Sequence, residues 1–276
     1  KRVLANQEKL DALKERYVKA MEDNNLEELR QIILDYTITD PVSGTANWTE
    51  VRQFNLMFET RLGSVSQDAN AVYLRPETAQ GIFVNYLNVQ KSGRMKLPFG
   101  IAQIGKAFRN EIVARQFIFR MREFEQMEMQ YFVRPGLEQE WFEHWKQVRM
   151  KWHQVLGLGD DNFRFHEHDK LSHYAKAAYD IEFNFPFGFK ELEGIHSRTD
   201  FDLGNHQKES GKKLQYYDPD IDQSYVPYVV ETSIGLDRMF LAVLTASYKE
   251  EEVPRDNGGK DWRVLMQIPP ALAPIK

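Results

Sequence analysis

Two segments near the middle of the chain, 99–111 and 122–133, alternate between polar and apolar residues. This period of two is typical of β-strands that bury one face, because successive side chains point to opposite sides of the sheet. A short connection, 112–121, separates them, so the two strands can pair directly. Strands joined by short connections favour an antiparallel sheet.

The rest of the chain supplies more strands and several helices. Apolar residues at spacings of three and four predict helices, and short runs rich in aromatic and β-branched residues predict strands. Strands are expected at 181–185, 187–195, 225–231 and 264–268, helices at 5–36, 137–156 and 236–248, and a polar loop at 254–260. The expected fold is therefore α+β: an antiparallel β-sheet flanked by helices, with a helical N-terminal or insertion segment.

Two helical segments have more than one interpretation. The segment 5–36, interrupted at Asn24-Asn25, is either a helical hairpin packed on the core or a mobile insertion. In 137–156 a stripe of large apolar side chains is interpreted as core packing and not as a ligand platform. The stripe consists of Trp141, Trp145, Val148, Trp152 and Val155.

Composition excludes several classes of protein. Hydrophobic residues make up 42% of the 276 residues, which is enough for a substantial core. No apolar run approaches the roughly 18 residues of a membrane span, and no signal segment opens the chain. There is no cysteine, so disulfides and thiolate metal sites are impossible, which is compatible with the cytosol. The net charge of −5 means that any surface for nucleic acid must be local.

One face of the central hairpin concentrates polar side chains. Alternation places Arg109 and Glu111 on this face of the first strand, and Phe124, Gln126 and Glu128 on this face of the second. A polar face on an otherwise buried sheet is either solvent-exposed or a binding site. The connecting loop adds Arg115 and Arg120, and arginine suits phosphate groups because it grips them through two parallel hydrogen bonds.

A second feature is a pair of carboxylates. Glu191 and Glu193 lie two apart in an extended segment, so both are expected to project to one side. Two carboxylates on one face repel each other unless a cation joins them, and magnesium bridging nucleotide phosphates would do so. The alternative is a pair of exposed glutamates at the rim of the sheet.

A third feature is the transition from a strand to a helix near the end of the chain. Glu231 ends the strand, Ser233 and Gly235 form a tight entry, and Arg238 falls in the first turn of the helix. The start of a helix offers backbone amides to an anion, and Arg238 adds a positive charge. The alternative for Arg238 alone is an ordinary surface arginine.

Together these segments resemble class II aminoacyl-tRNA synthetases. "AFRNEI" at 107–112 is similar to the second motif of that class, and "ETSIGLDR" at 231–238 to the third. The wider sequence, from about Trp48 to the C-terminus, resembles the dimeric type of glycyl-tRNA synthetase. The segments that carry this resemblance are "YLRPETAQGIF", "GIAQIGKAFRNEI", "RQFIFRMREFEQMEMQ", "FGFKELEGIHSRTDFDL" and "YVPYVVETSIGLDR".

This resemblance implies an ATP site. Arg109 would contact the α-phosphate of ATP and the glycine carboxylate, Glu111 the adenine amino group, and Phe124 the adenine ring. Arg238 would cover the other face of the ring and reach the terminal phosphates. The remaining residues implied at ATP, at Mg²⁺ or at the acceptor end of tRNA are Leu192 (ATP), Glu191 (ATP and Mg²⁺), Glu193 (Mg²⁺), Arg115 (acceptor end) and Arg120 (ATP phosphates or acceptor end).

The resemblance also implies a glycine site. Glu77, Glu128 and Glu231, with Ser233 and Gln126, would surround the glycine ammonium group. A substrate without a side chain offers only its ammonium and carboxylate groups, and charge-assisted hydrogen bonds from carboxylates suit the ammonium. Packed polar atoms would occupy the space of a methyl group, so alanine would be rejected.

The implied protein joins glycine to the 3′ end of tRNA(Gly) in the cytoplasm as a homodimer, using ATP and Mg²⁺. Residues 1–47 are expected to be a helical segment and turn, 48–268 the catalytic core, and 269–276 the start of a linker to an anticodon-binding domain. No match to the first class II motif precedes residue 48, and the stretch before it lacks cysteine, so no zinc is expected. Two rival hypotheses are a regulatory module that only binds ligand and a synthetase for another amino acid.

Overall fold

The structure of the chain is a computed structural model that describes residues 7–63, 70–114, 116–168, 175–254 and 258–275. The chain divides into two units, Lys1–Asn55 and Leu56–Lys276. Among the described residues, no helix has both the length and the apolar character needed to cross a membrane.

The N-terminal unit contains a pair of helices. α1 (Gln7–Glu22) and α2 (Leu26–Asp35) are separated at Asn25, whose side chain caps α2 by accepting a hydrogen bond from the backbone nitrogen of Glu28 at 3.0 Å. Arg16 of α1 bonds both Glu28 and Asp35 of α2, which ties the two helices together. The helical prediction for 5–36, including its interruption, is confirmed for the described residues 7–35.

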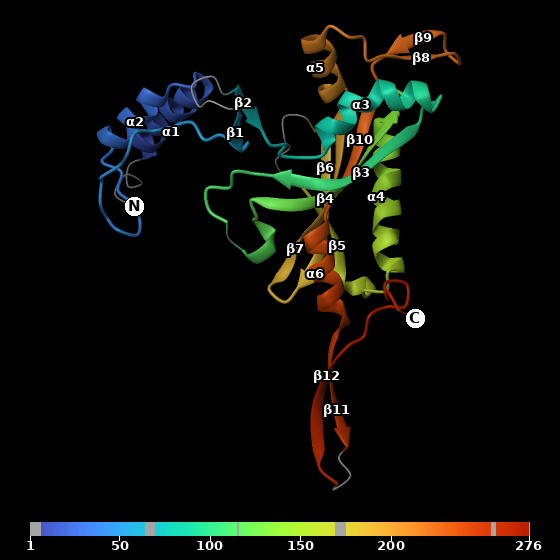
Figure 1. The fold of residues 1–276 in the computed structure, drawn as a ribbon. Coiled ribbons are helices and arrows are strands. Elements are labelled where there is room, and N and C mark those ends of the chain that lie inside the picture. Colours follow the sequence, from blue (N-terminus) through green and yellow to red (C-terminus); the bar gives the residue numbers. More distant parts are fainter. Residues whose placement is uncertain (1–6, 64–69, 115, 169–174, 255–257, 276) are drawn as a thin grey trace. The chain divides into compact units, whose positions relative to one another are not determined.

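The larger unit is built on a six-stranded sheet with the spatial order β3-β4-β10-β7-β6-β5, in which all neighbours are antiparallel. Its strands are β3 (Phe99–Phe108), β4 (Glu123–Val133), β5 (Phe163–Glu167), β6 (Ala177–Phe185), β7 (Gly188–Thr199) and β10 (Tyr228–Gly235). Figure 1 shows this sheet at the centre of the unit. The predicted antiparallel sheet and the α+β fold class are confirmed.

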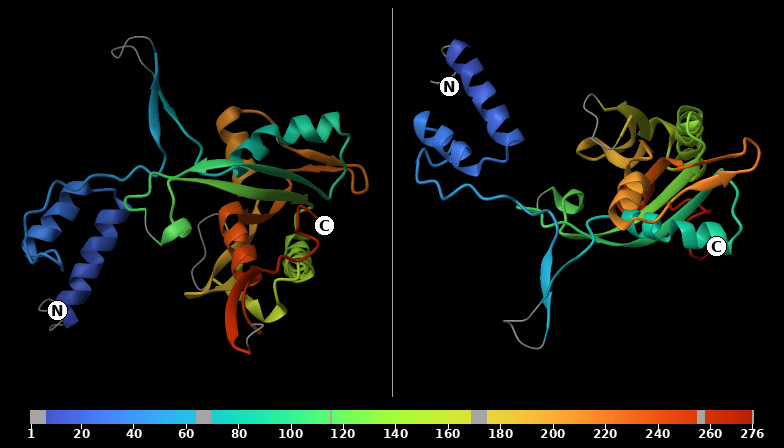
Figure 2. Two further views of the ribbon diagram at one scale, coloured as in Figure 1. Left: turned by 60° about the horizontal axis from the view of Figure 1, so that its bottom comes forward. Right: turned by 90° about the horizontal axis from the view of Figure 1, so that it is seen from above.

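Helices cover the two faces of this sheet unequally. α4 (Glu138–Val155) and α6 (Leu236–Ser247) pack on one face, around a core that includes Ile181, Ile195 and Ile234. α3 (Ala79–Ser92) and α5 (Phe201–Ser210) lie together over the other face, around Phe132, as Figures 1 and 2 show. Gln126, Glu128, Glu231 and Ser233 point to the second face, and a cavity opens over them.

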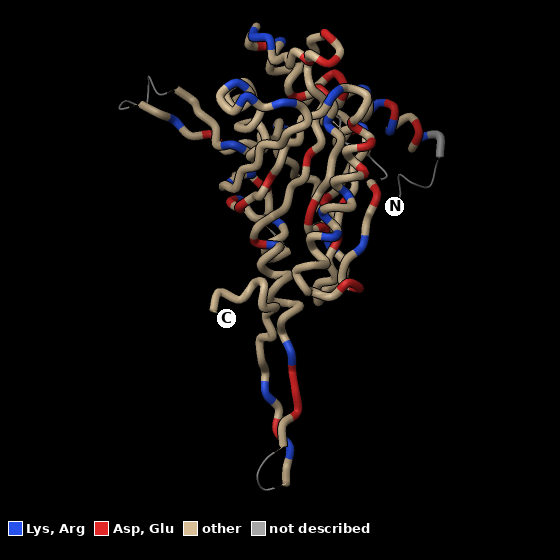
Figure 3. Tube along the Cα trace, turned by 90° about the vertical axis from the view of Figure 1, so that its right-hand side faces the viewer, with Lys and Arg blue, Asp and Glu red and all other residues tan. Residues whose placement is uncertain are grey.

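Short ribbons and turns complete the larger unit. They are the strand pairs β1 (Glu59–Leu62) with β2 (Asn70–Tyr73), β8 (Tyr216–Asp218) with β9 (Gln223–Tyr225), and β11 (Tyr248–Pro254) with β12 (Lys260–Met266), and the 3₁₀ turns η2 (Phe117–Phe119) and η3 (Asp160–Asn162). In the β11–β12 ribbon a run of three acidic residues on β11, Glu250–Glu252, lies beside Lys260 and Arg263 of β12, and Figure 3 shows charges of both signs along this ribbon. The polar loop expected at 254–260 is thus the tip of a longer hairpin, although 255–257 lie outside the described residues.

The tryptophan stripe of α4 is only partly in the core. Trp141 and Trp145 pack against the core as expected, but Trp152 is exposed and Val155 is 71% exposed, so the prediction is wrong for the C-terminal half of the stripe. The buried positions there include His153. Glu193 on the facing strand explains this orientation, because its buried carboxylate requires polar partners from the helix.

Candidate active site

The strand register brings the polar residues of three strands together. On β4 and β10, Glu128 lies opposite Ser233, and Gln130 lies opposite Glu231. The adjacent strand β7 places His196 opposite Glu231. One cavity is lined by side chains from all three strands and from the segment before α3. Its lining comprises Glu77, Arg109, Phe124, Gln126, Glu128, His168, Asp180, Glu191, Gly194, His196, Arg198, Glu231, Ser233, Gly235 and Arg238.

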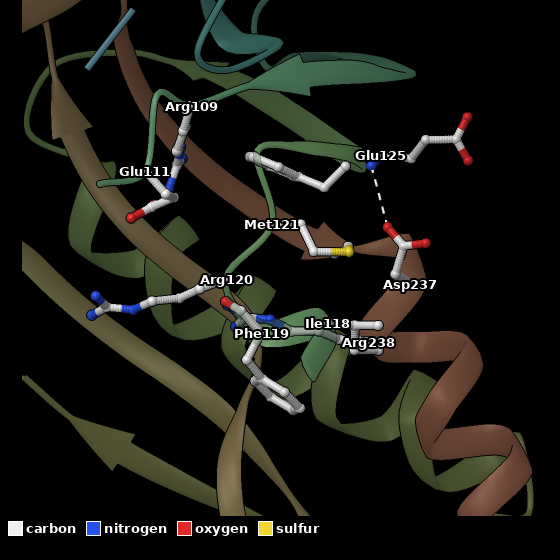
Figure 4. Close-up of a pocket in the computed structure, with 11 residues that line it drawn as sticks. Arg109, Glu111, Ile118, Phe119, Arg120, Met121, Glu125, Asp237 and Arg238 are labelled. Atoms are coloured by element: carbon white, nitrogen blue, oxygen red, sulfur yellow. Dashed lines mark hydrogen bonds between the residues drawn. The ribbon is translucent and has the colours of Figure 1, made fainter. Parts of the chain in front are cut away.

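A second cleft adjoins this cavity and contains arginines and aromatic rings (Figure 4). Arg109 lies with its guanidinium carbon 5.2 Å from the ring centre of Phe124, and Arg238 lies 4.9 Å from that of Phe119. Glu111 and Arg120 also line the cleft. Flat rings beside guanidinium groups suit a ligand that combines a heteroaromatic base with phosphates.

Backbone oxygens hold both arginines in place. Arg109 donates from Nε to the carbonyl of Pro76 at 3.1 Å. Arg238 donates to the carbonyl of Phe119 at 3.2 Å and to that of Glu191 at 3.0 Å, and its guanidinium lies 3.1 Å from the Glu191 carboxylate. These contacts orient the positive groups before any ligand binds, which lowers the cost of reorganisation.

The acidic end of the cavity contains Glu77, Glu128 and Glu231. Thr78, at the start of α3, donates from its hydroxyl to Glu128 and from its backbone nitrogen to the Gln126 side chain at 3.2 Å. The three carboxylates predicted to surround an ammonium group therefore line one cavity, together with Gln126 and Ser233.

Glu231 is a buried carboxylate with positive neighbours. Arg198 donates to it at 2.8 Å, Gln130 donates to it at 2.5 Å, and Nδ1 of His196 lies 3.1 Å away. Burial alone would raise the pKa of Glu231, but the His196 contact and the charge of Arg198 hold the pKa below its usual range. Glu231 is therefore a carboxylate that stays ionised in the interior.

Glu128 has the opposite environment. Burial raises its pKa well above the usual range, and the negative charge of Glu231 raises it further. The Thr78 hydroxyl opposes this shift without cancelling it. The cavity thus pairs an ionised carboxylate with one that favours the protonated form until a positive ligand arrives.

A bulge in β7 separates Glu191 from Glu193. The register against β6 pairs Glu182 with Glu191 and Ile181 with Glu193, so Leu192 is the extra residue. Glu191 lines the cavity, whereas Glu193 is buried against α4, 2.5 Å from Arg149 and 2.6 Å from His153. The expectation that both carboxylates project to one side is wrong, because the bulge breaks the alternation. Glu193 therefore faces away from any metal at the cavity.

Leu192 and Arg115, both predicted to be site residues, are not found among the residues that line the cavity. The side chain of Leu192 lies in the hydrophobic core and lines neither the cavity nor the arginine cleft. Arg115 lies outside the described residues, while Arg120 lines the arginine cleft. Among the described residues, no cluster of three or more His, Asp or Glu side chains forms a ready-made metal site.

Sequence reasoning missed several residues of the cavity. Arg198, His196 and Thr78 contact the acidic pocket but were not predicted there. Alternation along β7 from Gly194 would have placed His196 and Arg198 on the same face, had the bulge been recognised. Thr78 carried no strand or helix signal of its own, because the helix that begins after it was not anticipated.

Comparison with known families agrees with this geometry. Residues 58–248 match the family model "tRNA synthetase class II core domain (G, H, P, S and T)", and residues 1–56 match "Glycyl-tRNA synthetase insertion domain 1". Together the two matches cover the N-terminal unit and the larger unit as far as residue 248, and both models describe domains of aminoacyl-tRNA synthetases.

Curated relatives are similar over most of the chain. The chain is 57% identical over 249 residues to a glycine–tRNA ligase of Chlorobaculum tepidum, a match that covers 90% of the chain and 52% of the relative. It is 54% identical over 254 residues to that of Staphylococcus haemolyticus (91% and 54%). It is 52% identical over 275 residues to that of Macrococcus caseolyticus (96% and 59%). The chain thus spans about half the length of these relatives.

The resemblance stated from the motifs is therefore confirmed at the level of the family. The core match covers well over half of the chain, the insertion-domain match covers the remainder of the N-terminal side, and the sheet has the antiparallel architecture that the motifs predicted. The chain belongs to the class II aminoacyl-tRNA synthetases, and within them to the glycyl-tRNA synthetase family.

Proposed function

We propose that this chain forms the catalytic core of a glycine–tRNA ligase, which activates glycine with ATP and transfers it to the 3′ end of tRNA(Gly). The observation that carries the proposal is the acidic pocket of Glu77, Glu128 and Glu231 directly beside the cleft that contains Arg109 and Arg238. One end suits an ammonium group, and the other suits phosphates.

The acidic pocket favours glycine over larger amino acids. An ammonium ion between carboxylates forms charge-assisted hydrogen bonds, which are about twice as strong as neutral ones. The β4 and β10 positions around it carry Gln126 and Ser233, whose polar atoms lie 3.4 Å apart. A methyl group on the α-carbon would meet packed polar atoms there, which would have to lose hydrogen bonds to admit it.

The arginine cleft supports the ATP assignment. Phe124 offers a ring face for adenine, with the Arg109 guanidinium beside it. Glu111 lines the same cleft and offers acceptors for the adenine amino group. Arg238, held against Glu191, would reach the outer phosphates.

The proposed reaction needs no protein nucleophile. An oxygen of the glycine carboxylate attacks the α-phosphorus of ATP, the bond to the β-phosphate oxygen breaks, and pyrophosphate leaves. A ribose hydroxyl of the tRNA then attacks the carbonyl carbon of the adenylate, and AMP leaves. Arg109 and Arg238 orient the phosphates and balance the negative charge that develops on their oxygens.

Glu191 fits a magnesium ion that is held mainly by ATP. Mg²⁺ at nucleotide sites commonly takes only one or two protein carboxylates, together with phosphates and water. The Glu191 side chain is 53% exposed and borders the cavity, so it satisfies that requirement. Bound there, Mg²⁺ would neutralise phosphate charge.

The remaining parts of the proposal concern the whole protein. Arg120 is a candidate for the ATP phosphates or the tRNA acceptor end, and Arg115 for the acceptor end. We also propose that 1–47 is an inserted helical segment, that 48–268 is the core, and that 269–276 leads to an anticodon-binding domain. The active form would be a homodimer in the cytoplasm, without zinc, because the chain has no cysteine to hold it.

Exchange of labelled pyrophosphate into ATP tests this proposal. We expect exchange that depends on glycine and is not supported by alanine or serine. Glu128→Ala is expected to abolish glycine-dependent exchange while ATP binding is largely retained. Exchange supported equally by another amino acid would identify a different synthetase, and glycine binding without exchange would identify a regulatory module.

A further inference from the structure

A chain of hydrogen bonds runs from α5 to the acidic pocket through one side chain, Gln80. Its nitrogen Nε2 lies 2.9 Å from Oε1 of Glu77 and 3.0 Å from Oδ1 of Asp202. Its oxygen Oε1 lies 2.7 Å from Nε2 of His206. Gln80 sits in the first turn of α3, while Asp202 and His206 belong to α5.

The partners fix the orientation of the Gln80 amide. Carboxylate oxygens accept hydrogen bonds, so the atom that faces Glu77 and Asp202 must be the amide nitrogen. The amide oxygen then faces His206 and can only accept, so His206 carries its hydrogen on Nε2. A reversed amide would point its oxygen at two carboxylates and lose the hydrogen bonds to Glu77 and Asp202.

Asp202 connects this chain to the centre of the pocket. It receives two hydrogen bonds from Arg198, at 2.7 and 2.9 Å, and Arg198 in turn donates to Glu231 at 2.8 Å. Arg198 also lies 3.9 Å from Glu77. Gln80 and Arg198 thus both lie beside the Glu77 carboxylate, and Asp202 accepts hydrogen bonds from both of them.

We propose that Gln80 is a positioning residue for amino-acid recognition: oriented by His206, it fixes the Glu77 carboxylate at the spacing from Glu231 that a glycine ammonium group requires. Gln80 does not line the cavity, so it acts through Glu77 and not on the substrate. The inference rests on the proposed function, because it assigns Gln80 to the ammonium end of the same site.

The position of Gln80 predicts a selective effect. Glu77 is the one pocket carboxylate that lies outside the sheet, in the segment before α3, so its placement depends on contacts such as this one. Glu128 and Glu231 are fixed by strand register and burial. Gln80 does not line the arginine cleft, so recognition of ATP is expected to be independent of it.

Gln80→Met removes the amide and preserves the length and volume of the side chain. We expect the KM for glycine in pyrophosphate exchange to rise ~10-fold or more, the size that loss of a hydrogen bond to a charged group produces. The KM for ATP is expected to change less than about twofold, because Gln80 does not line the arginine cleft. His206→Ala is expected to act in the same direction more weakly, and His206→Gln to restore the wild-type value, because its amide nitrogen can donate.

The matched control is Asn85→Ala on the same helix. The Asn85 amide donates to the backbone oxygen of Gly81 at 2.9 Å and is exposed, so its loss is expected to leave both KM values unchanged. A Gln80→Met protein with wild-type KM for glycine, or with equal increases for glycine and ATP, would overturn the inference. If the wild-type protein shows no glycine-dependent exchange, the proposed function fails instead, so the two failures are distinct.

Discussion

Nη1 of Arg198 lies 2.8 Å from Oε2 of Glu231 in the protein interior, and both side chains are 4% exposed. The same guanidinium holds Asp202 through two further hydrogen bonds. The acidic pocket is therefore not a cluster of unpaired carboxylates. Arg198 neutralises Glu231, and Glu231 also lines the cavity, where a ligand can bind.

This pairing makes Arg198 a stability determinant. Arg198→Met would leave Glu231 and Asp202 buried without their cation, and removing one partner of a buried ion pair typically costs about 3–5 kcal/mol. We expect a loss of that size in the free energy of unfolding, measured with urea. Lys106→Met is the control, because the exposed Lys106–Glu123 pair should contribute no more than about 1 kcal/mol. A loss below about 1 kcal/mol in the Arg198 variant would contradict the pairing.

Glu128 is expected to limit stability at high pH. Its folded pKa is raised by burial and by Glu231, so the folded state binds a proton more tightly than the unfolded state does. Stability is then full below the unfolded pKa and declines as pH rises toward the folded pKa. Glu128→Gln cannot ionise, so we expect it to be more stable than wild type at pH 8 and nearly equal at pH 4. Thermal unfolding at both pH values measures this difference.

The outcome for Glu128→Gln must also include a loss of function. The neutral amide gives up the charge that an ammonium group would meet, so the glycine KM is expected to rise while stability increases. A substitution that increases the stability of the protein and weakens its function is typical of a position in a binding site. A variant that is less stable than wild type at pH 8 would show that the carboxyl is ionised in the free protein.

Arg109 is expected to matter for the reaction and not for the fold. Arg109→Lys keeps the charge but loses the flat guanidinium beside Phe124, so we expect the rate of pyrophosphate exchange to fall by roughly 100-fold. Arg164→Lys is the matched control, because Arg164 stacks 4.1 Å from the ring centre of Phe189 but lines neither cleft. A mild effect on exchange would refute the role of Arg109 at the α-phosphate.

The sequence predicted the central hairpin because strand alternation needs no knowledge of the partner. Arg109, Phe124 and Glu128 were placed on one face by period alone, and the structure has all three lining one cavity. The start of α6 at Leu236 was equally readable, but the expectation that the strand ends at Glu231 was wrong, because β10 runs on to Gly235. Features encoded within a few residues were accessible in this way.

Features that depend on distant partners were not accessible. α3 and α5 were missed for another reason: Ile82, Phe83 and Tyr86 recur at helical spacing, but no element was assigned to 79–92 or 201–210. The bulge at Leu192 has no signal in the sequence, since Glu191 and Glu193 alternate with an apolar residue as a regular strand would. Only pairing with β6 and burial against α4 reveal it.

The bulge gives a prediction that separates Glu191 from Glu193. Glu193 is buried between Arg149 and His153, which hold its pKa low despite burial, so Glu193→Gln should cost about 3–5 kcal/mol of stability. Glu191 is half exposed and pairs with Arg238 at the surface, so Glu191→Gln should change stability by no more than about 1 kcal/mol.

Their effects on magnesium should be reversed. We expect Glu191→Gln to raise the Mg²⁺ concentration needed for half-maximal pyrophosphate exchange, because a carboxylate beside the phosphates is lost. Glu193→Gln, assayed at a temperature where it remains folded, should keep the wild-type Mg²⁺ requirement, since its side chain lies on the opposite face of the sheet. A raised requirement in the Glu193 variant and none in the Glu191 variant would mean that β7 presents the other carboxylate to the nucleotide.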